Sequence, residues 1–218
     1  MNEEYFFHIK KKRPEEMFKN VTEYYNEDRC REYAYSKNMM RIQKKITKRA
    51  LELLDIENGN LLILDAGSGP GFASFYLKDL NFSVIALDLI PFFFKYYDLR
   101  DINPIVSDMC WLPFRSNTFD ALISISALQW VYTDINDKRM TNNLTNLIKS
   151  FFYVLKPNSK AIIQFYPKNT VLMDQIGKLI VNVSKFKGNY IIDDPNNPKK
   201  RKVFLKLEKR VILDNQSM

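Results

Sequence analysis

Apolar residues recur at helical spacing in one early segment and gather into short runs further along the chain. The helical spacing is carried by Met39, Ile42, Ile46, Ala50 and Leu53. Basic residues fall on the other face of this segment, and Gly59 stands in the loop expected after it. Residues 1–37 are polar and aromatic without a clear period. The pattern predicts an amphipathic helix over 39–53, preceded by an N-terminal extension.

Short apolar runs alternate with helical patterns over the rest of the chain. The runs cover 61–65, 83–88, 104–107, 119–124 and 160–165, and the helical patterns lie near 71–79, 91–99, 139–155 and 170–184. This alternation is typical of buried parallel strands connected by helices. Two last runs, 190–192 and 202–207, flank the turn-rich 193–198 and predict a closing antiparallel hairpin. We therefore expect an α/β fold with a seven-stranded, mostly parallel sheet and helices on both faces.

A glycine-rich loop follows the first predicted strand. Residues 64–71 read LDAGSGPG, so that Gly67, Gly69 and Gly71 are spaced as G-x-G-x-G. Glycines at a strand-to-helix turn let the backbone approach a nucleotide-like ligand closely, although such a loop alone is equally compatible with a tight turn. A dinucleotide fingerprint needs a third glycine at position 72, which is Phe72 here. The loop therefore argues against NAD and FAD.

Acidic residues follow the next two predicted strands, at the edge where open parallel sheets bind ligands. Asp88 ends the second strand, where its carboxylate can accept hydrogen bonds from both hydroxyls of a ribose. Asp108 follows the third strand and can accept from an adenine amino group, with Met109 against the ring. Each acid is by itself also an ordinary capping residue. The loop and the acids in this order predict S-adenosylmethionine as cofactor and a Rossmann-like class I methyltransferase fold, with Asp65 and Ser124 completing the cofactor-binding set.

Composition restricts the chemistry. With 218 residues, 46% of them hydrophobic, the chain is long enough for one globular domain. His8 is the only histidine, which excludes His-based triads and His-liganded metals. The isolated Cys30 and Cys110 predict buried thiols rather than a disulfide or a zinc site. The sequence shows no signal peptide and no apolar stretch of about 18 residues, so we expect a soluble intracellular protein.

Charge is distributed unevenly along the chain. The net charge is +8, but residues 61–134 hold eight Asp against four Lys or Arg, which leaves +12 on the flanks. Much of it lies in three clusters, namely 10–13, then Arg41, Lys44, Lys45, Lys48 and Arg49, and finally 199–202. Any one cluster is compatible with a solvated helix face or tail, but three around an acidic centre favour contact with nucleic acid.

Several segments together resemble the small-subunit (18S/16S-type) ribosomal RNA guanine-N(7) methyltransferase family, found in eukaryotes with relatives in archaea. The similarity runs over nearly the whole chain and is carried by 25–27, 42–44, 49–54, the glycine loop, 112–115, 119–121, 124–130, 164–169 and 193–195. The stretches SISALQW and QFYPKN are more distinctive than the glycine loop. Eukaryotic members usually carry a longer basic C-terminal tail than the one that follows Lys209-Arg210 here, so the resemblance implies less about nuclear targeting.

The resemblance implies methyl transfer to the seven-position nitrogen of a guanine in small-subunit ribosomal RNA, coupled to small-subunit biogenesis. This ring nitrogen has a free lone pair and needs alignment and desolvation rather than a base, which suits a chain with one histidine. We expect Gln129 and Trp130, after the fourth strand, and Tyr166, after the fifth, to hold a flipped guanine by stacking and hydrogen bonds. Trp130 is also compatible with an ordinary core position. Tyr25 and Tyr33 are expected over the methionine part of the cofactor.

The resemblance also implies a heterodimer with a small zinc-binding activator protein. In this fold the third strand lies at a sheet edge, where Ile105 and Val106 offer unpaired backbone groups. The preceding run 90–97 is apolar on more than one helical face, so a partner is expected to cover its exposed remainder. We expect residues 1–37 to form a lid on the cofactor and RNA side of a methyltransferase domain over 38–210, with a tail over 211–218.

Three other functions remain open on the sequence. A transfer RNA methyltransferase of the activator-dependent group usually shows paired histidines after the fourth strand, where this chain has Gln129-Trp130. A small-molecule methyltransferase has no use for the basic flanks, and a ribosome assembly factor with little catalytic role would still keep the cofactor loop. The expected compartments are nucleus and cytoplasm for a eukaryotic source, and cytoplasm for an archaeal one.

Overall fold

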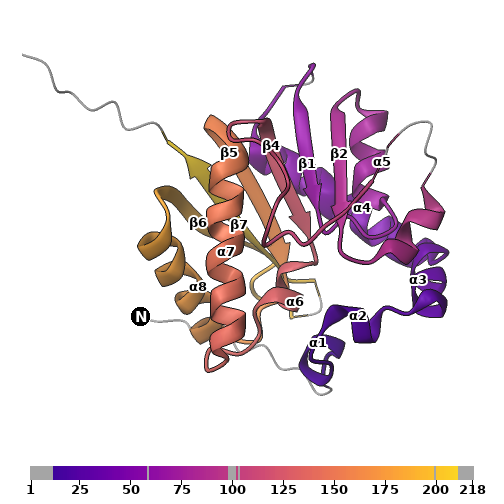
Figure 1. Cartoon of the computed structure of the whole chain (residues 1–218), viewed down its shortest axis with the longest axis horizontal. Helices are drawn as coiled ribbons and strands as arrows, with labels where there is room; N and C mark the ends of the chain where they lie inside the picture. The colour runs from indigo at the N-terminus through magenta and orange to yellow at the C-terminus, as the bar shows by residue number, and fades with distance from the viewer. Residues whose placement is uncertain (1–11, 58, 98–101, 103, 199, 211–218) are drawn as a thin grey trace, which may run out of the picture.

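The computed structural model describes residues 12–57, 59–97, 102, 104–198 and 200–210 (Figure 1). Within them, seven strands form one sheet in the order β3-β2-β1-β4-β5-β7-β6. The parallel strands are β1 (Leu62–Ala66), β2 (Ser83–Asp88), β3 (Ile105–Val106), β4 (Phe119–Ile125) and β5 (Leu155–Phe165). Two antiparallel strands, β6 (Phe186–Asp193) and β7 (Lys202–Lys209), close the sheet. The expected α/β fold and its closing hairpin are confirmed, and β3 lies at the edge.

Two layers of helices cover the sheet. Because successive side chains of a strand point to opposite faces, Ile63 packs with α4 (Lys37–Leu54) and α5 (Phe72–Asp79), while Leu64 packs with α7 (Lys138–Val154) and α8 (Thr170–Val183). In Figure 1, α7 crosses the near face of the sheet and α4 lies behind it. The strands are therefore buried on both faces, as their continuous apolar runs predict.

Helix α4 shows how the sequence sets an element's limits. Its apolar stripe, with Ile46 and Leu54, faces the sheet, and the basic residues face outward. Ser36 caps the N-terminus by accepting a hydrogen bond from the N–H of Met39, and Asp55 ends the helix in the left-handed conformation. The caps extend the helix beyond the 39–53 predicted from the apolar period alone.

Several elements differ from the sequence-based expectation. Residues 1–37 include three short helices, α1 (Pro14–Met17), α2 (Val21–Tyr24) and α3 (Glu27–Ala34), which are too short to show a clear period. Strand β5 begins at Leu155, ahead of the predicted 160, where it pairs with Phe119. Another short helix, α6 (Leu128–Val131), follows β4.

The predicted helix over 91–99 is instead the 3₁₀ helix η1 (Pro91–Tyr96), with residues 98 and 99 outside the described part of the chain. The apolar residues of this segment recur every three positions. This spacing favours a 3₁₀ helix over an α-helix, because side chains three positions apart lie above one another in a 3₁₀ helix. Ile90, Phe93 and Tyr96 pack together against α3, and Phe94 and Tyr97 form a second stripe with Ile102. Most of this apolar run is therefore packed inside the protein.

Both cysteines are buried free thiols, as the sequence predicts. Burial raises the pKa of Cys30 to about 11, and it also raises the pKa of Cys110. Across the described ranges, no helix has the length and apolar character needed to cross a membrane.

Candidate active site

A cavity of about 270 Å³ opens at the carboxyl ends of β1, β2 and β4. Its walls come from the glycine loop, the end of β2, the loop after β3, the segment after β4, the extension 19–33 and α7. Eight of the predicted site residues line it, namely Tyr33, Asp65, Gly67, Gly69, Asp88, Asp108, Met109 and Trp130. The chain folds so that parts far apart in sequence meet at one edge of the sheet, where ligands of open parallel sheets bind.

Four predicted residues stand outside the cavity wall. Gly71 packs beneath the ring of Tyr97, and Ser124 is buried within β4. Gln129 is buried in α6, where its Nε2 donates to the carbonyl of Ser126 at 2.7 Å. Tyr166 lies under the N-terminal extension instead, with the guanidinium of Arg13 over its ring.

The glycine loop has a backbone that side chains would obstruct. Gly67, Gly69 and Gly71 have φ of +79°, +54° and +88°, in the left-handed region that favours glycine. A Cβ at Gly67 would lie 2.6 Å from the Cβ of Ala127. The N–H of Gly67 donates to the carbonyl of Leu87 at 2.8 Å, which joins the loop to β2. The result is a bare backbone surface on the cavity, which fits a nucleoside cofactor lying close against it.

Asp88 links the end of β2 to that loop. Its Oδ2 accepts from the N–H of Gly69 at 2.7 Å and its Oδ1 accepts from the N–H of Ile90 at 2.8 Å. Burial raises the pKa of Asp88 to about 6, against the opposing effect of these N–H groups. Each oxygen keeps a further lone pair for ligand hydroxyls.

Asp65 is a second buried carboxylate on the same wall. The Ser74 hydroxyl donates to its Oδ2 at 2.6 Å. Burial raises the pKa of Asp65 to about 7, the Ser74 hydrogen bond opposes that rise, and the nearby charge of Asp88 adds to it. Two ionisable carboxylates in one cavity favour a ligand that carries positive charge.

Asp108 and Met109 form the wall after β3. The Oδ1 of Asp108 accepts from the N–H of Cys110 at 2.8 Å, so the acid also has the capping role that the sequence left open. The methyl carbon of Met109 comes within 3.6 Å of the position that a Cβ on Gly67 would take. Both residues line the cavity beside the glycine loop.

Aromatic rings close the cavity on the side of the extension. Tyr33 stacks on Phe72 with ring centroids 5.9 Å apart and an interplanar angle of 23°. The ring of Tyr25 lies 5.2 Å from Phe93 and 5.6 Å from Trp130. Trp130 is partly exposed to the cavity and is therefore not an ordinary core residue.

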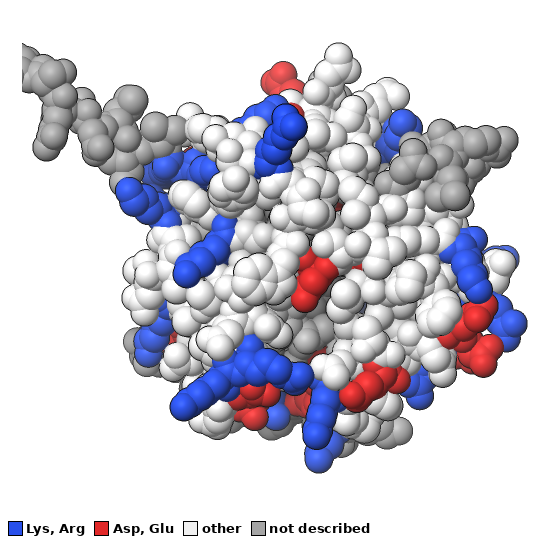
Figure 2. Space-filling model, in the orientation of Figure 1, with Lys and Arg blue, Asp and Glu red and all other residues white. Residues whose placement is uncertain are grey.

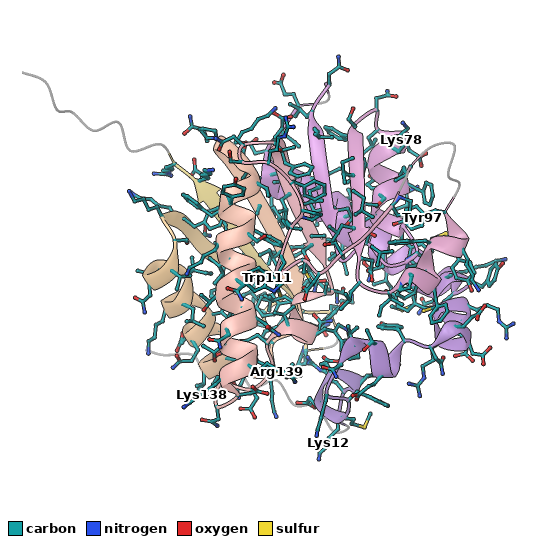
Figure 3. The ribbon with its side chains drawn as sticks, viewed as in Figure 1. Lys12, Lys78, Tyr97, Trp111, Lys138 and Arg139 are labelled. Atoms are coloured by element: carbon teal, nitrogen blue, oxygen red, sulfur yellow. The ribbon has the colours of Figure 1, made fainter. Side chains whose placement is uncertain are left out.

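Polar contacts hold the extension over the site. Arg139, at the start of α7, donates from Nη1 to Oδ1 of Asn20 at 3.1 Å and from Nη2 to the carbonyl of Lys19 at 3.2 Å. Arg13 donates to the carbonyl of Tyr166. Figure 3 shows Arg139 and Lys138 at the lower end of α7. Two basic residues of these contacts, Lys19 and Arg139, also line the cavity.

Several residues that line the cavity could not be selected from the sequence alone. Lys19, Asn20, Arg139 and Asn143 belong to segments without a recognisable motif, and they meet only in the folded chain. Gln43 is a polar residue on the buried face of an amphipathic helix, and this mismatch is a signal that sequence reasoning is able to use.

Comparisons with known proteins agree with this geometry. Residues 64–163 match a family profile described as a methyltransferase domain. The 18S rRNA (guanine(1575)-N(7))-methyltransferase of Saccharomyces cerevisiae is 34% identical over 192 residues, which cover 85% of this chain and 68% of that protein. The 18S rRNA (guanine-N(7))-methyltransferase of Bos taurus is also 34% identical, over 84% of this chain and 66% of that protein. This chain thus spans about two thirds of the length of these curated relatives.

Solved structures share the fold at low sequence identity. A putative S-adenosyl-L-methionine-dependent methyltransferase from Methanococcus maripaludis has a TM-score of 0.65 at 15% identity, covering 95% of this chain and 99% of that one. The N-methyltransferase NodS from Bradyrhizobium japonicum, solved with S-adenosyl-L-homocysteine, has a TM-score of 0.59 at 11% identity, covering 84% and 97%. With the identity to the yeast protein, these findings show that the chain belongs to the 18S rRNA (guanine-N(7))-methyltransferase family, whose fold is that of S-adenosylmethionine-dependent methyltransferases.

Proposed function

We propose that this chain transfers a methyl group from S-adenosylmethionine to the seven-position nitrogen of a guanine in small-subunit ribosomal RNA, as part of small-subunit biogenesis. The observation that carries the proposal is the cavity at the carboxyl edge of the sheet. The glycine loop and Asp88 form one part of its wall, and Trp130, Arg139 and Asn143 form another. The first part fits an adenosyl cofactor, and the second offers an aromatic ring and polar side chains for a base.

The residues of this cavity suit methylation of a ring nitrogen. S-adenosylmethionine, when bound, would supply a methyl group on a sulfonium. The lone pair of the guanine nitrogen would form the new bond as the carbon–sulfur bond breaks and S-adenosylhomocysteine leaves, so no proton would have to leave. The protein's contribution is alignment and exclusion of water. No histidine stands among the described residues, and the aromatic rings of Tyr25, Tyr33 and Trp130 line one side of the cavity.

The surface charge supports an RNA substrate. In Figure 2, Lys and Arg side chains lie mainly around the periphery of the molecule, while the centre of the face is largely uncharged. Lys19 and Arg139 are exposed and line the cavity, and Figure 3 shows the exposed Lys138 beside Arg139 at the lower end of α7. Arg49, from the predicted basic cluster of α4, is partly neutralised by Asp193, 2.9 Å away. Residues 10, 11 and 199 of the other two clusters lie outside the described part of the chain.

Transfer of tritiated methyl groups to isolated ribosomal subunits tests this proposal. We expect label from S-adenosylmethionine in small-subunit RNA and not in large-subunit RNA, with the label recovered as 7-methylguanine after hydrolysis. Asp88→Ala should lower the incorporation at limiting cofactor concentration. Label in another RNA, or on another atom of the base, would contradict the proposal.

We further propose that a small zinc-binding activator protein binds along β3 as a heterodimeric partner. The N–H of Ser107 donates to the carbonyl of Asp88, so the backbone groups of Val106 point away from β2, toward the open edge. Val106 is 55% exposed, and Trp111, in the loop that follows, is 65% exposed. An edge strand with unpaired backbone groups and nearby exposed apolar side chains supports strand addition by a partner.

The solubility of the chain, expressed alone and with the activator, tests the proposed heterodimer directly. We expect the chain expressed alone to be poorly soluble, because exposed apolar residues at the β3 edge favour aggregation, and we expect co-expression with the activator to rescue it. Good solubility together with full activity of the chain alone would contradict the partner.

A further inference from the structure

Hydrogen-bonded side chains run along one wall of the cavity, from α3 through α4 to the ends of β4 and β5. Nε2 of Gln43 donates to the hydroxyl of Tyr33 at 3.1 Å and to Oγ of Ser126 at 3.3 Å. Oγ of Ser126 donates in turn to Oε1 of Gln164 at 2.8 Å, and Nε2 of Gln164 donates to the carbonyl of Phe165. All donors in this series therefore point away from Gln43.

The two amides of this series are shielded from water, and Ser126 between them is held by further hydrogen bonds. Gln43 is 6% exposed and Gln164 is fully buried. Ser126 has a φ of +58°, which is uncommon for a residue other than glycine, and its N–H donates to the carbonyl of Gln164 at 2.8 Å. Its carbonyl accepts from Gln129 at 2.7 Å. Because Ser126 is held by its backbone and its side chain, Gln43 has a fixed partner on that side.

This arrangement decides what the Tyr33 hydroxyl is able to do. An amide nitrogen only donates, so the Tyr33 oxygen accepts from Gln43 and its own O–H remains a donor. Burial raises the pKa of Tyr33 to about 12, so the proton stays on the oxygen at neutral pH. In the part of the chain that the structure describes, no side chain or carbonyl accepts that proton. Tyr33 lines the cavity, where a ligand oxygen is able to accept it.

We propose that Gln43 is a positioning residue that directs the Tyr33 hydroxyl to donate to the carboxylate of the cofactor's methionine. The Tyr33 ring stacks on Phe72, the first residue of α5, which directly follows the glycine loop. The proposed cofactor lies along the bare backbone of that loop, and Tyr33 is expected over its methionine part. Gln43 therefore contributes to cofactor binding through Tyr33. The inference rests on the proposed cofactor.

Two probes separate this role from general support of the fold. S-adenosylhomocysteine carries the amino acid carboxylate, whereas 5′-methylthioadenosine has the same adenosine and lacks the amino acid. Their affinities are measured by calorimetry for the wild type and for Tyr33→Phe, Gln43→Met and the double variant. Ile46→Val is the control, because Ile46 is buried on the same face of α4 in the core.

We expect Tyr33→Phe to bind S-adenosylhomocysteine about 10- to 100-fold more weakly, as for loss of a hydrogen bond to a charged group, while its affinity for 5′-methylthioadenosine stays within about twofold. Gln43→Met should weaken S-adenosylhomocysteine binding by about 3- to 10-fold, and the double variant should match Tyr33→Phe alone, since Gln43 acts through Tyr33. Ile46→Val should leave both affinities unchanged.

Three results would overturn the inference. Equal losses for both probes would show that Tyr33 only supports the fold, and additive losses in the double variant would show that Gln43 acts independently. If Tyr33→Phe kept its affinity for S-adenosylhomocysteine but had a raised KM for RNA, the Tyr33 hydroxyl would donate to an oxygen of the target purine and not to the cofactor. If the wild type bound neither probe, the proposed function itself would fail, which is a different outcome from all three.

Discussion

The carboxylate of Asp88 accepts a hydrogen bond from the N–H of Gly69 at 2.7 Å, so the end of β2 and the glycine loop are joined inside the cavity. Gly69 has a φ of +54°, and nothing lies within 4 Å of the position its Cβ would take. The loop is thus kept open on the cavity side and is held in place from β2. Asp88 serves the loop and the ligand with the same carboxylate.

The variant Asp88→Ala tests this double role. Loss of the charged acceptor should weaken binding of S-adenosylhomocysteine by about 1 to 3 kcal/mol in calorimetry. Asp79→Ala is the matched control, since Asp79 is an exposed acid at the other end of α5 and its loss changes the net charge equally. Equal affinity in wild type and Asp88→Ala would place the cofactor elsewhere.

Cofactor binding should depend on pH through Asp65 and Asp88, whose pKa values burial raises to about 7 and about 6. Both carboxyl groups have a higher pKa in the folded, ligand-free protein than in the unfolded chain. Their contribution to the stability of the fold is therefore fully present below about pH 4 and is lost as the pH rises through 6 and 7. A cationic ligand prefers the ionised carboxylates. The affinity for S-adenosylmethionine should therefore rise between about pH 5 and pH 8, which calorimetry at several pH values measures. A constant or falling affinity over this range would contradict the roles given to both acids.

Gly67→Ala should destabilise the fold and weaken cofactor binding. The left-handed φ of +79° costs about 1 to 2 kcal/mol for a residue with a side chain, and the added Cβ would lie 2.6 Å from that of Ala127. Denaturant unfolding measures the loss. Gly177→Ala in α8 is the control, because open space surrounds its Cβ position and alanine should stabilise that helix by about 0.5 to 1 kcal/mol. Equal stability of the two variants would show that the loop conformation is not required.

Val106→Pro should abolish binding of the activator while leaving the fold intact. Proline removes the N–H that points to the open edge and leaves the β2 hydrogen bond of Ser107 in place. Size-exclusion chromatography of co-expressed proteins measures the loss of the complex. Val181→Ser, at an exposed apolar position on α8, is the control and should keep it. A complex that survives Val106→Pro would mean that the partner binds another surface.

The spacing of apolar residues predicted the elements that bury an apolar face in the core. The central strands and the helices α4, α5, α7 and α8 are long and buried on one side or both, so their patterns are strong. Helices α1 and α2 span only four residues each, and they are held by long-range contacts such as that between Arg13 and Tyr166. Such contacts leave no period in the local sequence.

The site residues likewise fall into those that the sequence predicted and those that only the folded structure brings together. The glycine loop, Asp88 and Asp108 were predictable because a ligand-binding sheet edge needs them in a fixed order along the chain. The series from Tyr33 through Gln43 to Ser126 was not predicted, since its members come from separate elements and their hydrogen-bond directions are defined only after folding. Gln129 stands out in sequence beside Trp130, yet it points to the carbonyl of Ser126 rather than into the cavity.

Borohydride reduction and aniline cleavage of small-subunit RNA, read by primer extension, tests the central claim most directly, because a guanine methylated at the seven position becomes a cleavage site. Cells with the active protein should show cleavage at one guanine, and cells with the Asp88→Ala variant should show less. Identical cleavage patterns with and without the protein would contradict methylation of small-subunit RNA by this chain.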